Sequence, residues 1–268
     1  MGDERSSVSN DGRIATEKSG HICLIIIDRP KKLNGFSVKM LSELGRAFSA
    51  MEDDPDIRCG VLCAEGRNFT AGLELNQVAK HLAEGALFPE DNVDPVNLHG
   101  SRLRTKPLVA AVQGICFTLG IELMLASDIV VAASDCRFAQ IEVKRGIMPS
   151  AGATIRMTER AGLGNALQYL LTGDEFNAET ALRLGFVQEV VAPGSERQRA
   201  IEIATLISEQ APLAVAATLA NARKAVFEGP NVAAAQLQKE QRRLQASEDA
   251  AEGVRSFIEK RPAKFSGR

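Results

Sequence analysis

The chain has 268 residues, of which 45% are hydrophobic and 25% are charged, and this ordinary globular composition excludes disordered, collagen-like and coiled-coil proteins. Its formal net charge of −2 offers no broad positive field to a nucleic acid or an anionic membrane. The longest stretch without a charge, residues 107–121, is shorter than the roughly 18 residues that span a bilayer. We therefore expect no nucleic-acid partner and no membrane partner.

The amino terminus is acidic and polar and lacks an apolar segment, which predicts a cytoplasmic protein in a reducing compartment. The five cysteines lie in apolar strings without a CxxC pair, and we expect them to be buried thiols. The sequence contains no HExxH motif, no GxSxG elbow, no phosphate-binding loop and no metal-spaced Cys/His cluster. We therefore expect no metal site.

The first half of the chain predicts strands separated by one long helix. A polar strand from residue 11, a Ser19-Gly20 turn and the run HICLIIID at residues 21–28 predict a β-hairpin that enters a buried sheet. Apolar residues at helical spacing predict a helix over residues 37–51, capped by Ser37. A further strand is expected at residues 60–64, and residues 77–100 read as a partly helical surface excursion.

The second half alternates strands with helices and then becomes entirely helical. Strands are expected at 108–112, 129–133 and 138–141, with a helix at about 120–126. A short helix opened by Asn177 and closed by Gly185 leads to a strand at 186–191. The remaining residues predict consecutive helices broken near residues 210–212, 229–230 and 247. The prediction is an α/β body at residues 1–195 and a helical module at residues 196–268.

Glu122 is the only charged residue among residues 107–127, most of which are apolar. An ionised carboxylate buried there would cost several kcal/mol, so it must be paired, solvated by a pocket, or protonated with a raised pKa. A raised pKa suits a general acid or base that works near neutral pH. The alternative is that Glu122 lies on a wet helix face, and the sequence does not decide between the two.

Two turns could present backbone N–H groups to an oxyanion. Leu119 lies at the start of the helix expected at 120–126, where amides lack partners inside the helix. Ala71-Gly72 allows close backbone approach and leaves the amide of Leu73 free to point at a ligand. A second carboxylate, Glu142, ends the predicted strand at 138–141, where its simplest role is a salt bridge to Lys144 or Arg145.

Four stretches, in this order, resemble the crotonase superfamily and its enoyl-CoA hydratase/isomerase family. They are DRPKKLNGFS at residues 28–37, RNFTAGLEL at 67–75, KPLVAAVQGICFTLGIELMLASDIVVAA at 106–133 and FAQIEVKRGIMPSAGAT at 138–154. The likeness continues to the ending EGVRSFIEKRPAKF and covers nearly the whole chain. The resemblance implies a crotonase-like spiral of ββα repeats with a carboxy-terminal helical module, assembled as a homotrimer or a dimer of trimers.

The resemblance also implies an enzyme that adds water across the α,β double bond of an enoyl-CoA. The amides of Leu73 and Leu119 would form the oxyanion hole for the thioester carbonyl. Glu122 would activate the water and Glu142 would deliver the α-proton. No separate cofactor is implied, because coenzyme A is part of the acyl-CoA substrate.

Other residues match the family segments that line the coenzyme A path. These are Lys31, Lys32, Leu33, Ala71 and Leu75. Lys260, Arg261 and Lys264 could reach the phosphates of coenzyme A bound to a neighbouring subunit, although a solvated helix end is the simpler interpretation.

The chain departs from the family pattern around the expected acyl site. Leu73 stands where alanine is common, Leu119 follows Phe117-Thr118 where a glycine-rich run is usual, and Ile141 stands where proline is common. Backbone donors survive such changes, but the volume of the acyl pocket does not. Double-bond isomerisation, acyl-CoA hydrolysis and acyl-CoA binding with little turnover therefore remain alternatives to hydration.

Overall fold

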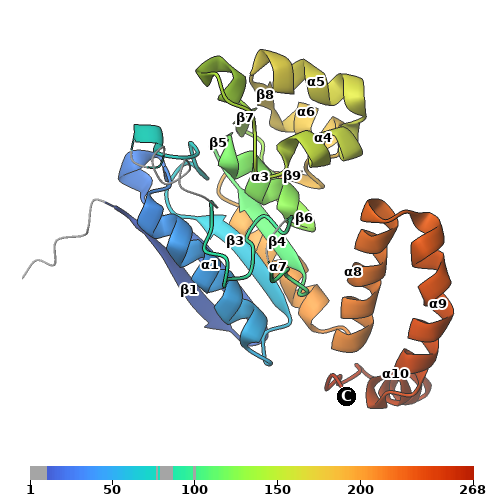
Figure 1. Ribbon diagram of the computed structural model, residues 1–268. Coiled ribbons are helices and arrows are strands. Elements are labelled where there is room, and N and C mark those ends of the chain that lie inside the picture. The colour runs from blue at the N-terminus through green and yellow to red at the C-terminus, as the bar shows by residue number, and fades with distance from the viewer. Residues whose placement is uncertain (1–10, 77, 79–86, 99–100) are drawn as a thin grey trace, which may run out of the picture.

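The computed structural model describes residues 11–76, 78, 87–98 and 101–268. A six-stranded sheet forms the body, a smaller three-stranded sheet lies beside it with a group of short helices, and three helices extend away at the carboxy terminus (Figure 1). The α/β class and the carboxy-terminal helices expected from the sequence are confirmed.

The larger sheet has the strand order β1-β2-β3-β4-β6-β9. β1 and β2 form the predicted antiparallel hairpin, and every later pair is parallel. The strands are β1 (Arg13–Ser19), β2 (Ile22–Asp28), β3 (Cys59–Ala64), β4 (Leu108–Val112), β6 (Ile129–Ala133) and β9 (Glu189–Val191).

Helices cover both faces of the central strands of the larger sheet, which explains why β2, β3 and β4 are apolar and buried, whereas the edge strand β1 is polar and mostly exposed. In β2 the alternate residues Cys23, Ile25 and Ile27 belong to the main core, which includes residues of α1 (Val38–Asp53) and α3 (Leu119–Ala126). Ile22, Leu24 and Ile26 join a second core with residues of α7 (Glu196–Ser208). Side chains on opposite sides of the pleat thus reach different helices.

The smaller sheet has the strand order β5-β7-β8, and its strand β5 begins directly after Gly114. Its strands are β5 (Ile115–Phe117), β7 (Arg137–Ala139) and β8 (Phe176–Asn177). The 3-10 helix η2 (Glu142–Arg145) follows β7, and the short helices nearby are α4 (Ala153–Ala161), α5 (Leu163–Thr172) and α6 (Ala178–Arg183). As predicted, Asn177 caps α6 by accepting the N–H of Thr180 at 2.9 Å.

The last three helices are α8 (Pro212–Phe227), α9 (Pro230–Gln245) and α10 (Glu248–Glu259). α8 and α9 begin at the last residue of a predicted break, and α10 begins directly after the third break. Every residue of α8 is at least partly exposed. Figure 1 shows α8 and α9 side by side, away from the body. The predicted boundary between the α/β body and the helical module, after residue 195, stays a prediction. Because α7 packs against the larger sheet, the first helix that extends away from the body is α8.

Within the described part of the chain, no single helix is long and apolar enough to cross a membrane; α7 and α8 together pass that test by length and composition, but the pair is bent by 109°. All five cysteines are free and buried, as expected: Cys23, Cys59, Cys63, Cys116 and Cys136.

Three expectations about local structure were wrong or incomplete. The strand expected at 138–141 is β7 and ends at Ala139, and Glu142 instead opens η2, because the backbone at Ile141 has turned to φ −95° and ψ 10°. The strand expected at 186–191 is shortened to β9, since Phe186 and Val187 bond back to Ala181 in the turn after α6. Of the excursion at 77–100, residues 77, 79–86 and 99–100 lie outside the described residues, and the described stretch 87–98 contains turns and bends.

Candidate active site

The two turns singled out in the sequence lie against each other. Thr70 pairs with Cys116, so the segment that leads to Gly72 runs beside β5. A Cβ added to Gly72 would lie only 1.8 Å from Thr118 Oγ1. Gly72 has φ +97°, which glycine adopts readily, and this contact also leaves no room for any other side chain.

The peptide geometry directs the N–H groups of Leu73 and Leu119 away from the surrounding backbone. In a trans peptide the C=O and the next N–H point in opposite directions. The Gly72 C=O accepts the N–H of Phe36 at 2.8 Å, so the Leu73 N–H points away from Phe36. The Thr118 C=O accepts N–H groups from the first turn of α3, so the Leu119 N–H points out of the helix. Neither N–H is hydrogen-bonded to any described residue.

Thr118 holds a backbone conformation that is rare for a β-branched residue, with φ 49° and ψ −116°. Such a conformation costs on the order of 1–3 kcal/mol and persists where the surrounding structure enforces it. Here the Thr118 N–H donates to the Ala139 C=O at 3.0 Å, and its side chain lies against Gly72. The strain therefore falls at the residue that aims the Leu119 amide.

Glu122 lies in the first turn of α3 and is 4% exposed, so the wet helix face considered from the sequence is wrong. Its Oε1 accepts the N–H of Ala151 at 2.7 Å and of Ala153 at 3.2 Å. Burial raises the pKa of Glu122, while these two amides and the charge of Arg156 act in the opposite direction. The carboxylate thus has stabilising donors at one oxygen.

Glu142 is also buried, at 8% exposed, and its Oε2 has no hydrogen-bond partner among the described residues. The salt bridge expected with Lys144 or Arg145 is wrong: Lys144 pairs with Asp174 at 3.7 Å, and Glu142 makes no ion pair within the described ranges. Burial raises the pKa of Glu142 to about 7, and the nearby Glu122 carboxylate adds to the rise. The two glutamates therefore occupy one region but have different surroundings.

Two buried residues near the glutamates were missed in the sequence. Arg156 on α4 is 5% exposed, donates through Nη2 to the C=O groups of Val96 and Asn97, and leaves Nη1 without a described partner. Gln140 is fully buried, and neither polar atom of its side chain has a partner in the described structure. The signal for Arg156 was a lone arginine in the otherwise uncharged run GIMPSAGATIRM.

The residues expected along the coenzyme A path come together at the surface. Lys31 and Lys32 lie in the 3-10 helix η1 (Pro30–Lys32) with exposed side chains. The Leu33 C=O accepts the N–H of Ala71 at 2.9 Å, which joins this segment to the turn that precedes Leu73. Leu33 and Leu75 are 45% and 39% exposed, which is a large exposed fraction for leucine side chains.

The carboxy-terminal cations are not equivalent. The guanidinium of Arg261 bonds Glu252 and Glu259, with Nη1 at 2.6 Å from Glu252 Oε1. Lys260 and Lys264 form no ion pair with a described residue. Of the three residues considered for phosphate binding, Arg261 therefore already has carboxylate partners on the same chain.

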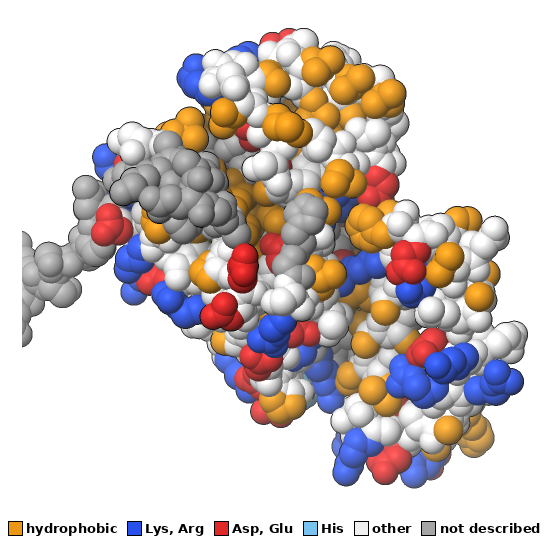
Figure 2. All heavy atoms as spheres, viewed as in Figure 1, with side chains coloured by type: hydrophobic (Ala, Val, Ile, Leu, Met, Phe, Trp, Pro, Cys, Tyr) orange, Lys and Arg blue, Asp and Glu red, His pale blue; other side chains and the backbone are white. Residues whose placement is uncertain are grey.

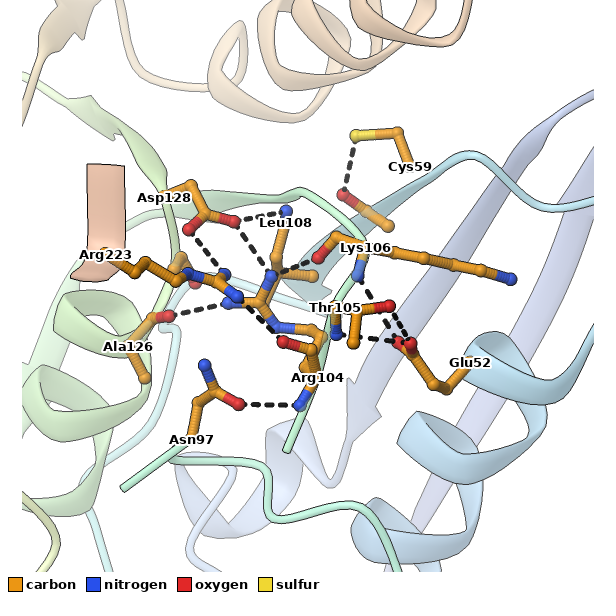
Figure 3. Close-up of polar contacts among 12 residues, drawn as sticks. Glu52, Cys59, Asn97, Arg104, Thr105, Lys106, Leu108, Ala126, Asp128 and Arg223 are labelled. Carbon is orange, nitrogen blue, oxygen red and sulfur yellow. Dashed lines mark hydrogen bonds and ion pairs between the residues drawn. The ribbon is translucent and has the colours of Figure 1, made fainter. Parts of the chain in front are cut away.

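An ion network around the buried side chain of Arg104 lies at the carboxy-terminal end of α3 (Figure 3). Asp128 pairs with Arg104 at 2.8 Å and with Arg223 of α8 at 2.7 Å. Arg104 also donates to the C=O of Ala126, the last residue of α3, at 2.8 Å. Although burial alone would raise it, Arg104 and Arg223 hold the pKa of Asp128 below its usual range. The network joins α8 to the helix that carries Glu122.

The arrangement suits chemistry at a carbonyl: paired N–H donors beside two buried carboxylates can hold an oxyanion while protons move. No group of three or more His, Cys, Asp or Glu side chains able to hold a metal ion occurs in the described regions.

Comparison with known proteins gives a consistent result. The family model described as enoyl-CoA hydratase/isomerase matches residues 17–268. A probable enoyl-CoA hydratase/isomerase from Mycobacterium abscessus is 47% identical, with a TM-score of 0.91 over 95% of this chain and 98% of that chain. An enoyl-CoA hydratase from Mycobacterium tuberculosis is 34% identical, covering 94% of this chain and 96% of the relative.

A carnitinyl-CoA dehydratase from Proteus mirabilis is also 34% identical, over 93% of this chain and 96% of its own length. The relatives thus bear the names of different reactions on CoA thioesters, while the match to the fold runs through the whole body and the carboxy-terminal helices. The spiral fold of the crotonase superfamily, expected from the sequence, is confirmed, and the chain belongs to the enoyl-CoA hydratase/isomerase family.

Proposed function

We propose that this protein is an enoyl-CoA hydratase, a carbon–oxygen lyase that adds water to the α,β double bond of an enoyl-CoA. The observation that carries the proposal is the pair of buried carboxylates, Glu122 and Glu142, with unlike surroundings. Hydration needs one group to accept a proton from water and another to donate a proton to carbon. A single carboxylate would suffice for simpler family reactions.

In this mechanism the thioester carbonyl binds between the N–H groups of Leu73 and Leu119. Glu122 accepts a proton from water as the water oxygen bonds to the β-carbon. The double-bond electrons move toward the carbonyl oxygen, where the two amides stabilise the enolate, an effect worth about 3–4 kcal/mol per donor in comparable sites. Glu142 then donates its proton to the α-carbon, which gives a 3-hydroxyacyl-CoA.

The surroundings of the two glutamates support these roles. A general acid must keep its proton near neutral pH, and the pKa of Glu142 is raised to about 7. Glu122 has two amide donors and the charge of Arg156 to favour its ionised form, as a base requires.

The coenzyme A moiety would lie along Lys31, Lys32, Leu33, Ala71 and Leu75. This segment is bonded to the turn of Leu73, so a thioester bound there extends toward the oxyanion donors. The exposed leucines offer apolar contact, and the two lysines offer mobile positive charge to phosphates.

We also propose that the chain assembles as a homotrimer or a dimer of trimers. Large apolar side chains are exposed on α10, where Phe257 is 85%, Ile258 72% and Val254 63% exposed. Leu163 and Leu171 of α5 are 61% and 67% exposed. Figure 2 shows hydrophobic side chains on the lobe formed by α4, α5 and α6. Patches of this kind are typical of interaction surfaces.

A hydration assay decides between the candidate reactions. Crotonyl-, decenoyl- and aryl-substituted enoyl-CoAs would be tested, together with carnitinyl-CoA, because dehydration is the reverse of the same chemistry. Turnover of an enoyl-CoA to its 3-hydroxyacyl-CoA supports the proposal. Failure to hydrate any of them, with retained exchange of the α-proton in deuterated water, would favour isomerisation instead. Release of free coenzyme A would indicate hydrolysis, and binding without turnover a weakly catalytic homologue.

A further inference from the structure

We propose that Arg29 and Glu74 are positioning residues that hold the Leu73 amide in place and connect it to the coenzyme A segment. The inference rests on the proposed function only in assigning the Leu73 N–H to the thioester carbonyl. Neither residue is assigned a contact with the thioester carbonyl or a proton transfer, and their effect would pass through the backbone.

The ion pair itself is short and shielded from water. Arg29 Nη1 lies 2.5 Å from Glu74 Oε2, and the side chains are 5% and 22% exposed. Glu74 follows Leu73 directly, and Arg29 directly precedes η1, which carries Lys31 and Lys32. The pair therefore joins the two segments that the proposed function uses.

The same guanidinium nitrogen also fixes the backbone opposite the Leu73 turn. Arg29 Nη1 donates to the C=O of Gly35 at 2.9 Å. The next residue, Phe36, donates its N–H to the Gly72 C=O at 2.8 Å and accepts the Glu74 N–H at 3.0 Å. Arg29 thus holds Gly35 on one side and Glu74 on the other, with Phe36 and Leu73 between them.

This geometry makes the direction of the Leu73 N–H depend on the ion pair. The peptide plane of Gly72 and Leu73 is set by the bond from Phe36, because C=O and N–H are rigidly opposed. If Glu74 moves relative to Gly35, that plane tilts and the Leu73 donor leaves its line to the carbonyl. Misplacement of a reacting group by about 1 Å can cost about 100-fold in rate.

The chain offers an ion pair of the same residue types whose side chains do not bridge Gly35 and the Leu73 turn. Glu65 pairs with Arg197 at 2.8 Å, but both side chains are more exposed, at 43% and 35%. Glu65→Gln removes the same charge and the same contact type as Glu74→Gln. An effect seen only at Glu74 is therefore a property of its position.

The test compares Glu74→Gln, Glu74→Asp and Glu65→Gln in the full-length enzyme. We expect Glu74→Gln to lower kcat by about 10- to 100-fold with little change in KM, the pattern of an interaction made in the transition state. Glu74→Asp keeps the charge and should retain more activity than Glu74→Gln. Glu65→Gln should match the unmodified enzyme.

A second readout does not depend on the reaction. Butanoyl-CoA labelled with carbon-13 at the carbonyl is bound to each protein, and the infrared band of that carbonyl is measured. Hydrogen bonds from the oxyanion donors lower the frequency, so we expect the band to move back toward its free value in Glu74→Gln and to stay in place in Glu65→Gln. Binding of the ligand itself is measured by calorimetry.

Several results would overturn the inference. These are an unshifted carbonyl band in Glu74→Gln, equal losses in Glu74→Asp and Glu74→Gln, or a loss in Glu65→Gln as large as at Glu74. The failure of the proposed function looks different: the unmodified enzyme would turn over no enoyl-CoA, while the carbonyl band of bound butanoyl-CoA would still report on the Leu73 amide.

Discussion

Burial raises the pKa of Glu142 to about 7, and the Glu122 carboxylate lies close enough to add to that rise. Burial also raises the pKa of Glu122, but there Ala151 and Ala153 donate to Oε1 and oppose the effect of burial. Two chemically identical side chains are thereby given different tendencies to hold a proton. Pairs of titratable groups held in different protonation states are typical of acid–base sites.

Replacing either glutamate by glutamine should remove most of the activity. We expect Glu122→Gln and Glu142→Gln each to lower kcat by about 10²- to 10⁴-fold, because each deletes one proton transfer and keeps the side-chain volume. Steady-state kinetics with the best substrate of the panel measures this. Glu179→Gln, at an exposed glutamate of α6, is the control. Full activity in either site variant would exclude the assigned role.

The pH dependence of kcat/KM should identify which glutamate is the acid. Since Glu142 must be protonated to act, activity in the hydration direction should fall as pH rises through about 7. The acid limb should report Glu122, which must be ionised. In Glu142→Gln the residual activity should lose the alkaline limb. If that limb persists in Glu142→Gln, another group causes it.

Glu142 should also make the protein less stable as pH rises. Its pKa is higher in the folded chain than in the unfolded chain, so the folded state binds more protons between about pH 4.5 and 7, and stability falls across that window. The loss amounts to at most about 3 kcal/mol above pH 7. Glu142→Gln should therefore gain stability relative to the unmodified protein at pH 8 but not at pH 4. Urea unfolding at both values measures this, and a gain independent of pH would contradict it.

Gly72→Ala should separate the two turns that carry the proposed oxyanion donors, Leu73 and Leu119. The new Cβ would stand 1.8 Å from Thr118 Oγ1, and the positive φ adds backbone strain. We expect a loss of kcat of about 100-fold or more, because both donors move. Gly194→Ala is a matched control: it has φ +88°, but its Cβ would meet nothing within 4 Å. Comparable kcat in the two variants would show that the contact with Thr118 is unimportant.

Local sequence signals predicted much of the fold. The hairpin, the cap at Ser37, the α6 turn and the breaks between the last helices all depend on residues within a few positions of one another. The strand before Glu142 was misjudged because the apolar residue Ile141 makes the sequence look strand-like up to the residue at which the backbone turns. Periodicity alone does not show where pairing with a neighbouring strand ends.

The candidate site was predictable only in part. The isolation of Glu122 in an apolar run was visible, and so were the turns at Leu73 and Leu119. The salt bridge expected for Glu142 was wrong because Lys144 and Arg145, although close in sequence, do not reveal that the Glu142 side chain is buried. Arg29 and Glu74 are 45 residues apart, and Arg223 and Asp128 are 95 apart, so only the folded chain brings these charges together.

Replacing Asp128 should strongly lower the free energy of unfolding, because its carboxylate pairs with two arginines at once. The Arg104 side chain has no exposed surface, and Asp128 accepts its Nη1 at 2.8 Å and Arg223 Nη2 at 2.7 Å (Figure 3). Asp128→Asn would leave the buried guanidinium of Arg104 without its counterion, which typically costs about 3–5 kcal/mol. Arg223→Gln should cost less, since Asp128 would keep Arg104. Urea unfolding at pH 7 measures the free energy of each variant.

Asp56→Asn serves as the control, because Asp56 is 73% exposed and its pair with Lys18 at 3.3 Å should contribute at most about 1 kcal/mol. The pH dependence gives an independent check. The pKa of Asp128 is lowered in the folded chain, so its stabilisation is present above the usual aspartate pKa of about 4 and is lost as pH falls below it. The difference between the unmodified protein and Asp128→Asn should therefore shrink in acid. A variant as stable as Asp56→Asn at pH 7, or a difference that does not change with pH, would mean that Arg104 finds another partner once the carboxylate is gone.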